Sequence, residues 1–442
     1  MVELRPITAL LASIILNSIN LIVADLNLTI LHTNDVHCRF LSFNSQTRNC
    51  EANDIKENHC WGGAARRMTL VERFRRQFKN TLFLDAGDQY QASCVSYVSC
   101  VKAGFKAHRT IWFTMLDWEP IAKYMNLIKY DAMCLGNHDF DHGIFGLVPF
   151  LANITCKIVD SNIYSTDPNH PSPLEKYFQN YLLYTFVDSQ GQNQTVAVVG
   201  YTISTTPEIS SPGPDVGFSV KNARLSIEVL FSQRMALDEI PALQRVVDQL
   251  KAKGVKRIIA LGHSGINMDR KVCRSVKGLD LVIGGHTNTF LYTGQPPIDQ
   301  TPEGPYPEVY RDTGENCLVV QAYAYGQYLG FLQVNFDENG QIDRWNGNPI
   351  LIDAKVPENP EMVQLLEPYS KRLVDLERQV VGMTEITINT IGETCKRHEC
   401  PTANGVADAF VEYYRNSVLN ESNSPNASDY AADELCNALD LV

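Results

Sequence analysis

Histidine, aspartate and asparagine side chains recur in five short motifs along the chain. The motifs are Asn34-Asp35-Val36-His37, Gly87-Asp88, Gly136-Asn137-His138-Asp139, Gly262-His263-Ser264-Gly265 and Gly284-Gly285-His286-Thr287-Asn288. Divalent zinc, manganese and iron take imidazole nitrogens and carboxylate oxygens as ligands. A lone histidine is usually structural and a lone Gly-Asp is usually a turn, but four of the ten histidines occur in these motifs. Together the motifs predict a metal centre.

Two cations at one centre would suit the hydrolysis of phosphate esters. One carboxylate can bridge two ions about 3.5–4 Å apart, which is the separation found in two-metal hydrolases. Such a pair clamps a phosphate group and supplies hydroxide at neutral pH. Glycine precedes Asp88, Asn137, His263 and His286, which predicts sharp turns and a close approach of the backbone to the ions.

His138 and Asp141 form a second predicted layer within Gly-Asn-His-Asp-Phe-Asp. Asn137 would bind metal through its carbonyl oxygen, while His138 faces the phosphate and either protonates the leaving group or stabilises the developing charge. Asp141 would then orient the imidazole and keep it charged. In the alternative assignment, His138 is the ligand and Asn137 is structural, and the sequence leaves both assignments open.

Each motif follows a short apolar run. The runs span residues 28–31, 81–84, 130–135, 257–261 and 279–283. Runs of this length predict buried strands, and segment 241–253 predicts a helix that Gly254 ends. Alternating helices and strands predict an α/β sandwich. Because ligands bind beyond the carboxyl ends of such strands, we expect the five loops to converge on one crevice.

Residues 357–381 predict one long helix, because apolar residues recur there at three- and four-residue steps. This helix is interpreted either as a connector between domains or as a helix packed on the first domain. The expected organisation is a signal peptide at 1–24, a catalytic domain at 25–340, a linker with the long helix at 341–383 and a partial C-terminal domain at 384–442.

The amino end and the overall charge favour an exported protein that does not bind nucleic acid. The apolar run from Ile7 to Val23 predicts a secretory signal cleaved near Ala24. No later segment has the length of a membrane span or the hydrophobic tail of a lipid-anchor signal, so we expect secretion without a membrane anchor. The net charge of −12 argues against nucleic acid as a partner.

Cysteine usage agrees with export. Of the twelve cysteines, three close pairs predict the disulfides Cys50–Cys60, Cys94–Cys100 and Cys395–Cys400. The remaining six have no predicted partners; they are Cys38, Cys134, Cys156, Cys273, Cys317 and Cys436. Glycosylation sequons occur at Asn27, Asn153, Asn193, Asn420 and Asn426.

Taken together, the motifs resemble those of the 5′-nucleotidase/apyrase family of calcineurin-like metallophosphoesterases. The matching stretches are residues 30–37, 84–91, 136–143, 261–265 and 284–292, with further similar segments at 200–202 and 320–330. The resemblance covers roughly residues 28–410. It implies a four-layer α/β/β/α sandwich, followed by a linker helix and a truncated C-terminal nucleotide-binding domain.

The resemblance also implies roles for the motif residues. By similarity, Asp35, His37 and Asp88 would hold one ion, and Asp88, Asn137, His263 and His286 would hold the other. His138 and Asp141 correspond to the family's catalytic dyad. The implied metal is zinc.

The activity implied by the resemblance is that of a secreted 5′-nucleotidase or apyrase, as in insect-type apyrases. Such an enzyme releases phosphate from extracellular AMP, ADP or ATP by attack of metal-bound hydroxide. Two alternatives remain open at this stage. One is a broader phosphohydrolase or nucleotide-sugar hydrolase, and the other is a non-catalytic secreted binding protein on the same scaffold.

Two segments depart from the family pattern. Within Cys395-Lys-Arg-His-Glu-Cys400, Lys396 stands where the family has a substrate-facing arginine, and Arg397 is one place away. We expect Lys396 and Arg397 to contact substrate, with lysine lacking the bidentate fork of arginine. Residues 92–109 are an insertion relative to the family, interpreted as a lid over the metals or as an artefact of the sequence.

Overall fold

The computed structural model describes residues 25–45, 48–89, 111–165, 172–213, 216–218 and 239–377, together with five isolated positions between 404 and 411. Most strands belong to two sheets. The larger sheet has the order β15 (Ile342–Gly347), β14 (Tyr328–Phe336), β1 (Leu26–Thr33), β2 (Thr81–Asp85), β3 (Ala132–Met133), β4 (Lys157–Val159) and β6 (Phe178–Gln179), with β16 (Ile350–Leu351) paired to β14. The second has the order β12 (Glu308–Tyr310), β13 (Cys317–Val320), β11 (Leu281–Ile283), β10 (Arg257–His263), β8 (Asn193–Thr202) and β7 (Tyr181–Val187). A separate pair joins β5 (Ile163–Ser165) to β9 (Val216–Phe218).

Side-chain alternation along the strands explains why the sheets are covered on both faces. In β2, Leu82 and Leu84 belong to the core shared with the second sheet, whereas Phe83 belongs to the core beneath the helices. In β1, Ile30 belongs to the core shared with the second sheet, and Leu31 belongs to the core beneath the helices. Successive side chains of a strand point to opposite faces, so continuous apolar runs supply two cores at once.

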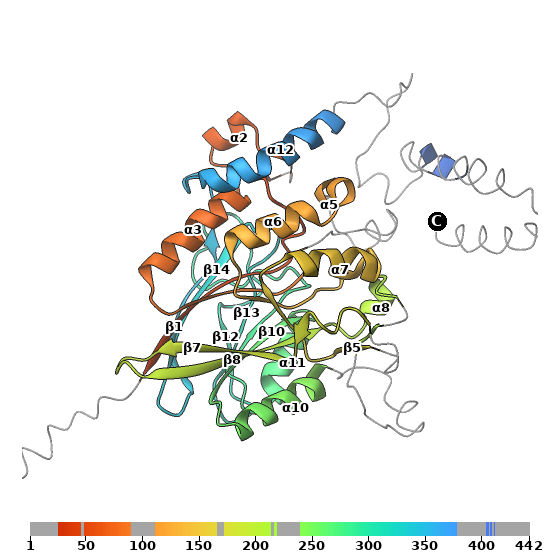
Figure 1. The fold of residues 1–442 in the computed structure, drawn as a ribbon. Coiled ribbons are helices and arrows are strands. Elements are labelled where there is room, and N and C mark those ends of the chain that lie inside the picture. Colours follow the sequence, from red (N-terminus) through yellow and green to blue (C-terminus); the bar gives the residue numbers. More distant parts are fainter. Residues whose placement is uncertain are drawn as a thin grey trace, which may run out of the picture.

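Helices cover the outer faces of both sheets (Figure 1). The larger sheet carries α3 (Ala64–Gln77), α5 (Ile111–Leu116), α6 (Glu119–Ile128), α7 (Gly143–Asn153) and α12 (Pro360–Glu377), and the second carries α10 (Glu239–Ala252) and α11 (Ile266–Ser275). Short helices α2 (Ala52–Lys56), η1 (His138–Phe140) and α8 (Thr206–Ile209) lie in the connections. The predicted four-layer α/β/β/α fold is therefore confirmed.

The predicted strand runs all contain strands, although several differ in length from the prediction. Segment 130–135 forms ladder pairs only at Ala132–Met133, because the chain leaves the sheet there to enter the loop that carries Asn137. The predicted helix at 241–253 begins earlier, at Glu239, because Pro241 is tolerated in a first turn. Gly254 has a φ of 81° and follows the end of this helix, as predicted.

The long helix α12 packs against the helices of the larger sheet. Met362, Leu366 and Leu373 are buried in the same core as residues of α3 and α6. On the surface, the Tyr369 hydroxyl lies 2.7 Å from Lys123 Nζ and 3.0 Å from Glu119 Oε1 on α6. Over 360–377 the helix thus packs on the helical layer of the larger sheet. Residues 378–381 of the predicted helix lie outside the described residues.

Two disulfides occur in the described part of the chain. The predicted Cys50–Cys60 bond is present, and a second bond joins Cys273 of α11 to Cys317 of β13. The other described cysteines are buried free thiols at Cys38, Cys134 and Cys156. The pairs 94/100 and 395/400, and Cys436, lie outside the described residues. Among the described helices, none combines the length and the apolar character that crossing a membrane requires.

A buried carboxyl group just before β11 gives a test of stability against pH. Asp280 Oδ2 accepts a hydrogen bond of 2.7 Å from the Ile258 amide, and burial raises the pKa of Asp280 to about 8. An unfolded aspartate titrates near about 4. Because the folded pKa is the higher one, this group's contribution to stability is full below about pH 4 and is lost as the pH rises toward about 8.

Asp280→Asn should remove this pH dependence. We expect the free energy of unfolding of the variant, relative to wild type, to increase between about pH 5 and about pH 8. Urea unfolding at several pH values, with the disulfides intact, measures this difference. A difference that stays constant with pH would contradict the assignment.

Candidate metal centre

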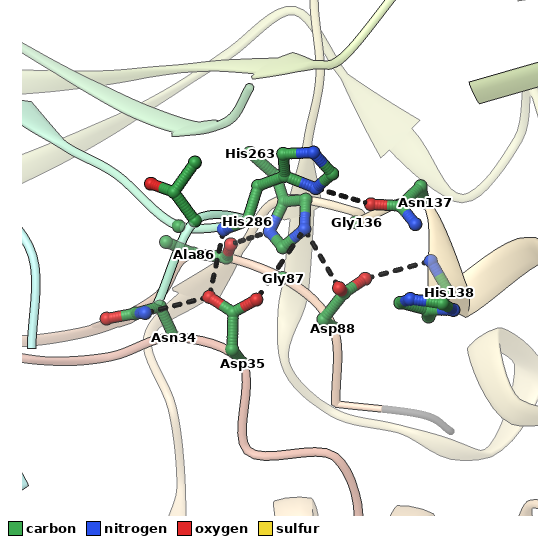
Figure 2. Close-up of polar contacts among 12 residues, drawn as sticks. Asn34, Asp35, Ala86, Gly87, Asp88, Gly136, Asn137, His138, His263 and His286 are labelled. Carbon is green, nitrogen blue, oxygen red and sulfur yellow. Dashed lines mark hydrogen bonds and ion pairs between the residues drawn. The ribbon is translucent and has the colours of Figure 1, made fainter. Parts of the chain in front are cut away.

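The five predicted loops meet at one edge of the two sheets. Strands β1, β2 and β3 run parallel in the larger sheet, and β10 and β11 run parallel in the second. Parallel strands place their carboxyl ends at the same edge. Figure 2 shows the side chains of Asp35, Asp88, Asn137, His263 and His286 pointing toward one another there.

A first group of potential ligands consists of Asp35, His37 and Asp88. Their ligand atoms lie within 4.8 Å of one another, and all three residues are buried. His37 Nε2 is 3.7 Å from Asp35 Oδ1 and 3.9 Å from Asp88 Oδ2. These separations are too long for hydrogen bonds and suit atoms arranged around a common ion.

A second group consists of Asp88, His263 and His286, again within 4.8 Å. His263 Nε2 is 3.0 Å from Asp88 Oδ2. Asn137 Oδ1 lies 2.8 Å from His286 Nδ1 (Figure 2), which adds the predicted carbonyl oxygen to this group. Asp88 belongs to both groups, as a bridging carboxylate would.

The donor set fits divalent cations. Asp35 Oδ1 is buried and makes no hydrogen bond with any described residue. His263 faces both carboxylates, and although burial lowers its pKa, Asp88 and Asp35 outweigh this and raise it to about 10. A protonated imidazole between two aspartates supplies the positive charge that a cation would supply. Buried carboxylates require such a partner.

The backbone conformation of the ligand loops is unusual. Four of the predicted ligands have left-handed φ values: Asp35 (51°), His37 (50°), Asp88 (57°) and His286 (75°). Non-glycine residues rarely adopt this region, and they cluster at functional sites when they do. The turns aim consecutive polar side chains into one small volume.

Most of the glycines that precede the ligands are needed for lack of space rather than for a sharp turn. The sequence predicts sharp turns at all four, but only Gly87 has a left-handed φ, of 84°. At Gly285 the reason is space, since an added Cβ would lie 2.7 Å from Ala86 O and 2.8 Å from His263 Nδ1. Gly262 lies inside β10, where the ring of Tyr201 occupies the place of a side chain.

Buried carboxylates hold the loop of Asp88 in place. Asp139 Oδ2 accepts hydrogen bonds from the amides of Gly136 (2.7 Å) and Asp88 (3.1 Å), joining the second and third loops. Asp85 Oδ1 accepts another from the Gly87 amide at 3.1 Å. The sequence analysis gives Asp139 no role, although its place between His138 and Asp141 could have indicated that it belongs to the site.

His138 and Asp141 form a pair beside the metal groups. His138 Nδ1 lies 2.8 Å from Asp141 Oδ2, and Ser210 Oγ donates to Asp141 Oδ1 at 2.9 Å. Burial opposes protonation of His138, but Asp88 and the hydrogen bond to Asp141 raise its pKa to about 9. Nδ1 of His138 is thus engaged by Asp141, while Asn137 Oδ1 lies beside His286 Nδ1. Which of His138 and Asn137 is a ligand stays a prediction.

Two predicted site residues and one predicted insertion fall outside the part of the chain that the structure describes. Lys396 and Arg397 lie outside the described residues, as does the insertion at 92–109. The candidate centre therefore consists of the six predicted ligands and the His138–Asp141 pair. His263 is the last residue of β10, and the other five ligands follow the ends of β1, β2, β3 and β11.

Comparison with known proteins relates this geometry to one family. The model of the calcineurin-like phosphoesterase family matches residues 28–290. The chain is 39% identical to the 5′-nucleotidase of Bos taurus over 386 residues, which are 87% of this chain and 59% of the bovine protein. It is 38% identical to a snake venom 5′-nucleotidase of Naja atra, covering 87% of this chain and 64% of the venom protein. The chain thus spans less than two thirds of these relatives.

Solved structures give the same relationship. A 5′-nucleotidase precursor from Thermus thermophilus superposes with a TM-score of 0.67 at 30% identity, over 88% of this chain and 68% of that one. The NAD nucleotidase of Haemophilus influenzae superposes with a TM-score of 0.65 at 21% identity, over 83% and 63% of the two chains. The second likeness concerns the fold alone.

Proposed function

Because the chain belongs to the calcineurin-like phosphoesterase family, we propose that it is a two-metal phosphohydrolase that releases phosphate from nucleotides. The observation that carries this proposal is the sharing of Asp88 between two groups of buried ligand atoms. A single acidic cluster would bind one cation, whereas two groups with a common carboxylate suit a pair.

Asp35, His37 and Asp88 would hold one ion, and Asp88, Asn137, His263 and His286 the other. Bound cations of this kind neutralise phosphate oxygens and make a nucleophile available at neutral pH. Zinc is our proposal for the metal, since histidine and carboxylate ligands suit it. The protein contributes buried, pre-positioned donors in loops fixed by Asp139 and Asp85.

His138 is the proposed catalytic acid. Asp141 engages Nδ1 of the ring, so Nε2 is the ring nitrogen left for the substrate. The charge of Asp88 and the hydrogen bond to Asp141 favour the protonated ring, against the effect of burial on its pKa. A protonated imidazole next to a phosphate stabilises developing negative charge or gives its proton to the leaving oxygen.

The nucleotide class of substrate follows from the relatives, which are named 5′-nucleotidases. We propose 5′-nucleotidase or apyrase activity on AMP, ADP or ATP. Lys396 and Arg397 are proposed substrate contacts by their place in the sequence. Secretion is proposed from the apolar run before Asp25 and from two disulfides, a bond type typical of exported proteins.

Phosphate release from AMP, ADP and ATP tests this function directly. We expect release from at least one nucleotide, abolition by a metal chelator, and recovery when zinc is added back. Equal rates on AMP, ATP and a simple aryl phosphate would contradict the nucleotide preference. Nucleotide binding by the metal-loaded protein without any turnover would contradict catalysis itself.

A further inference from the structure

The segment that follows β13 contributes no proposed ligand, yet it contacts the loops of both ligand groups. β13 pairs with β11 through Val320 and Ile283, and the Gly284 amide donates to Val320 O at 2.9 Å. The next residues, Gln321 to Tyr323, therefore run beside the loop that carries His286. Gln321 is completely buried.

The carboxamide of Gln321 bonds to both sides of His286. Its Nε2 donates to Gly285 O at 3.0 Å, and its Oε1 accepts from the Thr289 amide at 3.0 Å. Nε2 also donates to Asp269 Oδ2 at 2.7 Å, which fixes the amide to α11. One side chain thus closes the loop 285–289, in which His286 has a left-handed φ of 75°.

The backbone of the same segment holds the loop of Asp35 through Asn34. The Ala322 amide donates to Asn34 Oδ1 at 2.9 Å, and Asn34 Nδ2 donates to Tyr323 O. Asn34 Nδ2 also donates to Asp35 Oδ2 at 2.8 Å (Figure 2). The same Oδ2 accepts from the His286 amide at 2.9 Å, so the two loops meet.

We propose that Gln321 and Asn34 are positioning residues for the two metal groups, with Gln321 setting His286 and Asn34 setting Asp35. This inference rests on the two-metal assignment proposed above. Each side chain is a carboxamide that donates from one end and accepts at the other. A carboxylate of the same shape cannot donate, and it would face the oxygens of Asp269 and Gly285 in one case and of Asp35 and Tyr323 in the other.

Metal binding by Gln321→Glu and Asn34→Asp tests the proposal without relying on turnover. Metal-free protein is titrated with Zn²⁺ alone in competition with a chromophoric chelator, and with Co²⁺ alone while its absorption spectrum is recorded. We expect each variant to bind one of its two ions about 10–100-fold more weakly, the loss typical of residues that orient metal ligands. The weakened site should differ between the variants, and so should the changed Co²⁺ spectrum.

Gln194→Glu is the matched control. Gln194 Nε2 donates to Asp188 Oδ2 at 2.7 Å, just as Gln321 donates to Asp269, but it lies at the opposite end of β8 from the metal loops. Both metal affinities should be unchanged in this variant. Adding Asp269→Asn to Gln321→Glu restores a donor at that contact and should recover part of the lost affinity.

The outcomes separate this inference from the function on which it rests. Wild-type affinities for both ions in Gln321→Glu and Asn34→Asp, or an equal loss in Gln194→Glu, would overturn the positioning roles. If Gln321→Glu does not fold, Gln321→Asn, which keeps a shorter amide, should show the same selective loss. Failure of the wild-type protein to bind two ions would instead overturn the two-metal assignment.

Discussion

Replacing Asp88 with asparagine is expected to abolish phosphate release, with a fall in kcat/KM of at least about four orders of magnitude, since metals account for much of the acceleration such an enzyme achieves. Asp88 is the one residue shared by the two ligand groups. Asparagine keeps the shape of the side chain but loses the charge, so binding of both ions should weaken together. Metal content after dialysis and initial rates with AMP measure the two effects.

Asp280→Asn is a suitable control for Asp88→Asn, because it makes the same change at a buried aspartate just before β11 rather than at a ligand. It should retain two ions and activity near that of wild type. Activity within about tenfold of wild type in Asp88→Asn at matched metal content would contradict the bridging role.

The second large effect is expected for His138→Asn, which should lower kcat about 10²–10⁴-fold, the usual contribution of a general acid. Both ions should stay bound, because His138 belongs to neither ligand group. The loss should be smaller for a nitrophenyl phosphate than for AMP, because a good leaving group needs little help from an acid. Steady-state kinetics with both substrates measure this difference.

Asp141→Asn serves as the companion variant. Its effect should be smaller than that of His138→Asn, because it removes the partner of Nδ1 but leaves the ring in place. Loss of a metal ion from His138→Asn would contradict the catalytic assignment and support the alternative in which His138 is a ligand. Equal losses with the two substrates would contradict proton donation to the leaving group.

Much of the fold could be predicted because its buried strands are continuous apolar runs that are easy to recognise in the sequence. Leu82, Phe83 and Leu84 of β2 are apolar on both faces, as expected for a strand between two covered faces. The motifs that follow them combine histidine, aspartate and asparagine. These residues seldom cluster at strand ends for structural reasons alone. For these reasons the strand and motif patterns predicted an α/β sandwich with five loops meeting at one edge, whereas the four-layer form and the roles of the individual ligands came from the family resemblance.

Other features depend on contacts that no local pattern records. The Cys273–Cys317 bond spans 44 residues and exists because α11 packs on β13. Gln321 is an ordinary polar residue in a segment without ligands, and its contacts appear only when β13 is paired with β11 in the observed register. The sequence predicts a turn at Gly262, but the need there is room for a ring from the neighbouring strand.

The left-handed backbone at four ligand positions also limits what evolution or an experimenter can place there. Asp35, His37, Asp88 and His286 hold φ values between 50° and 75°, a region that asparagine, aspartate and histidine tolerate far better than β-branched residues. A valine or threonine at these positions would therefore damage the loop as well as the ligand. Asparagine removes the carboxylate charge or the imidazole while sparing the conformation, so histidine-to-asparagine and aspartate-to-asparagine exchanges are the informative ones at these four positions.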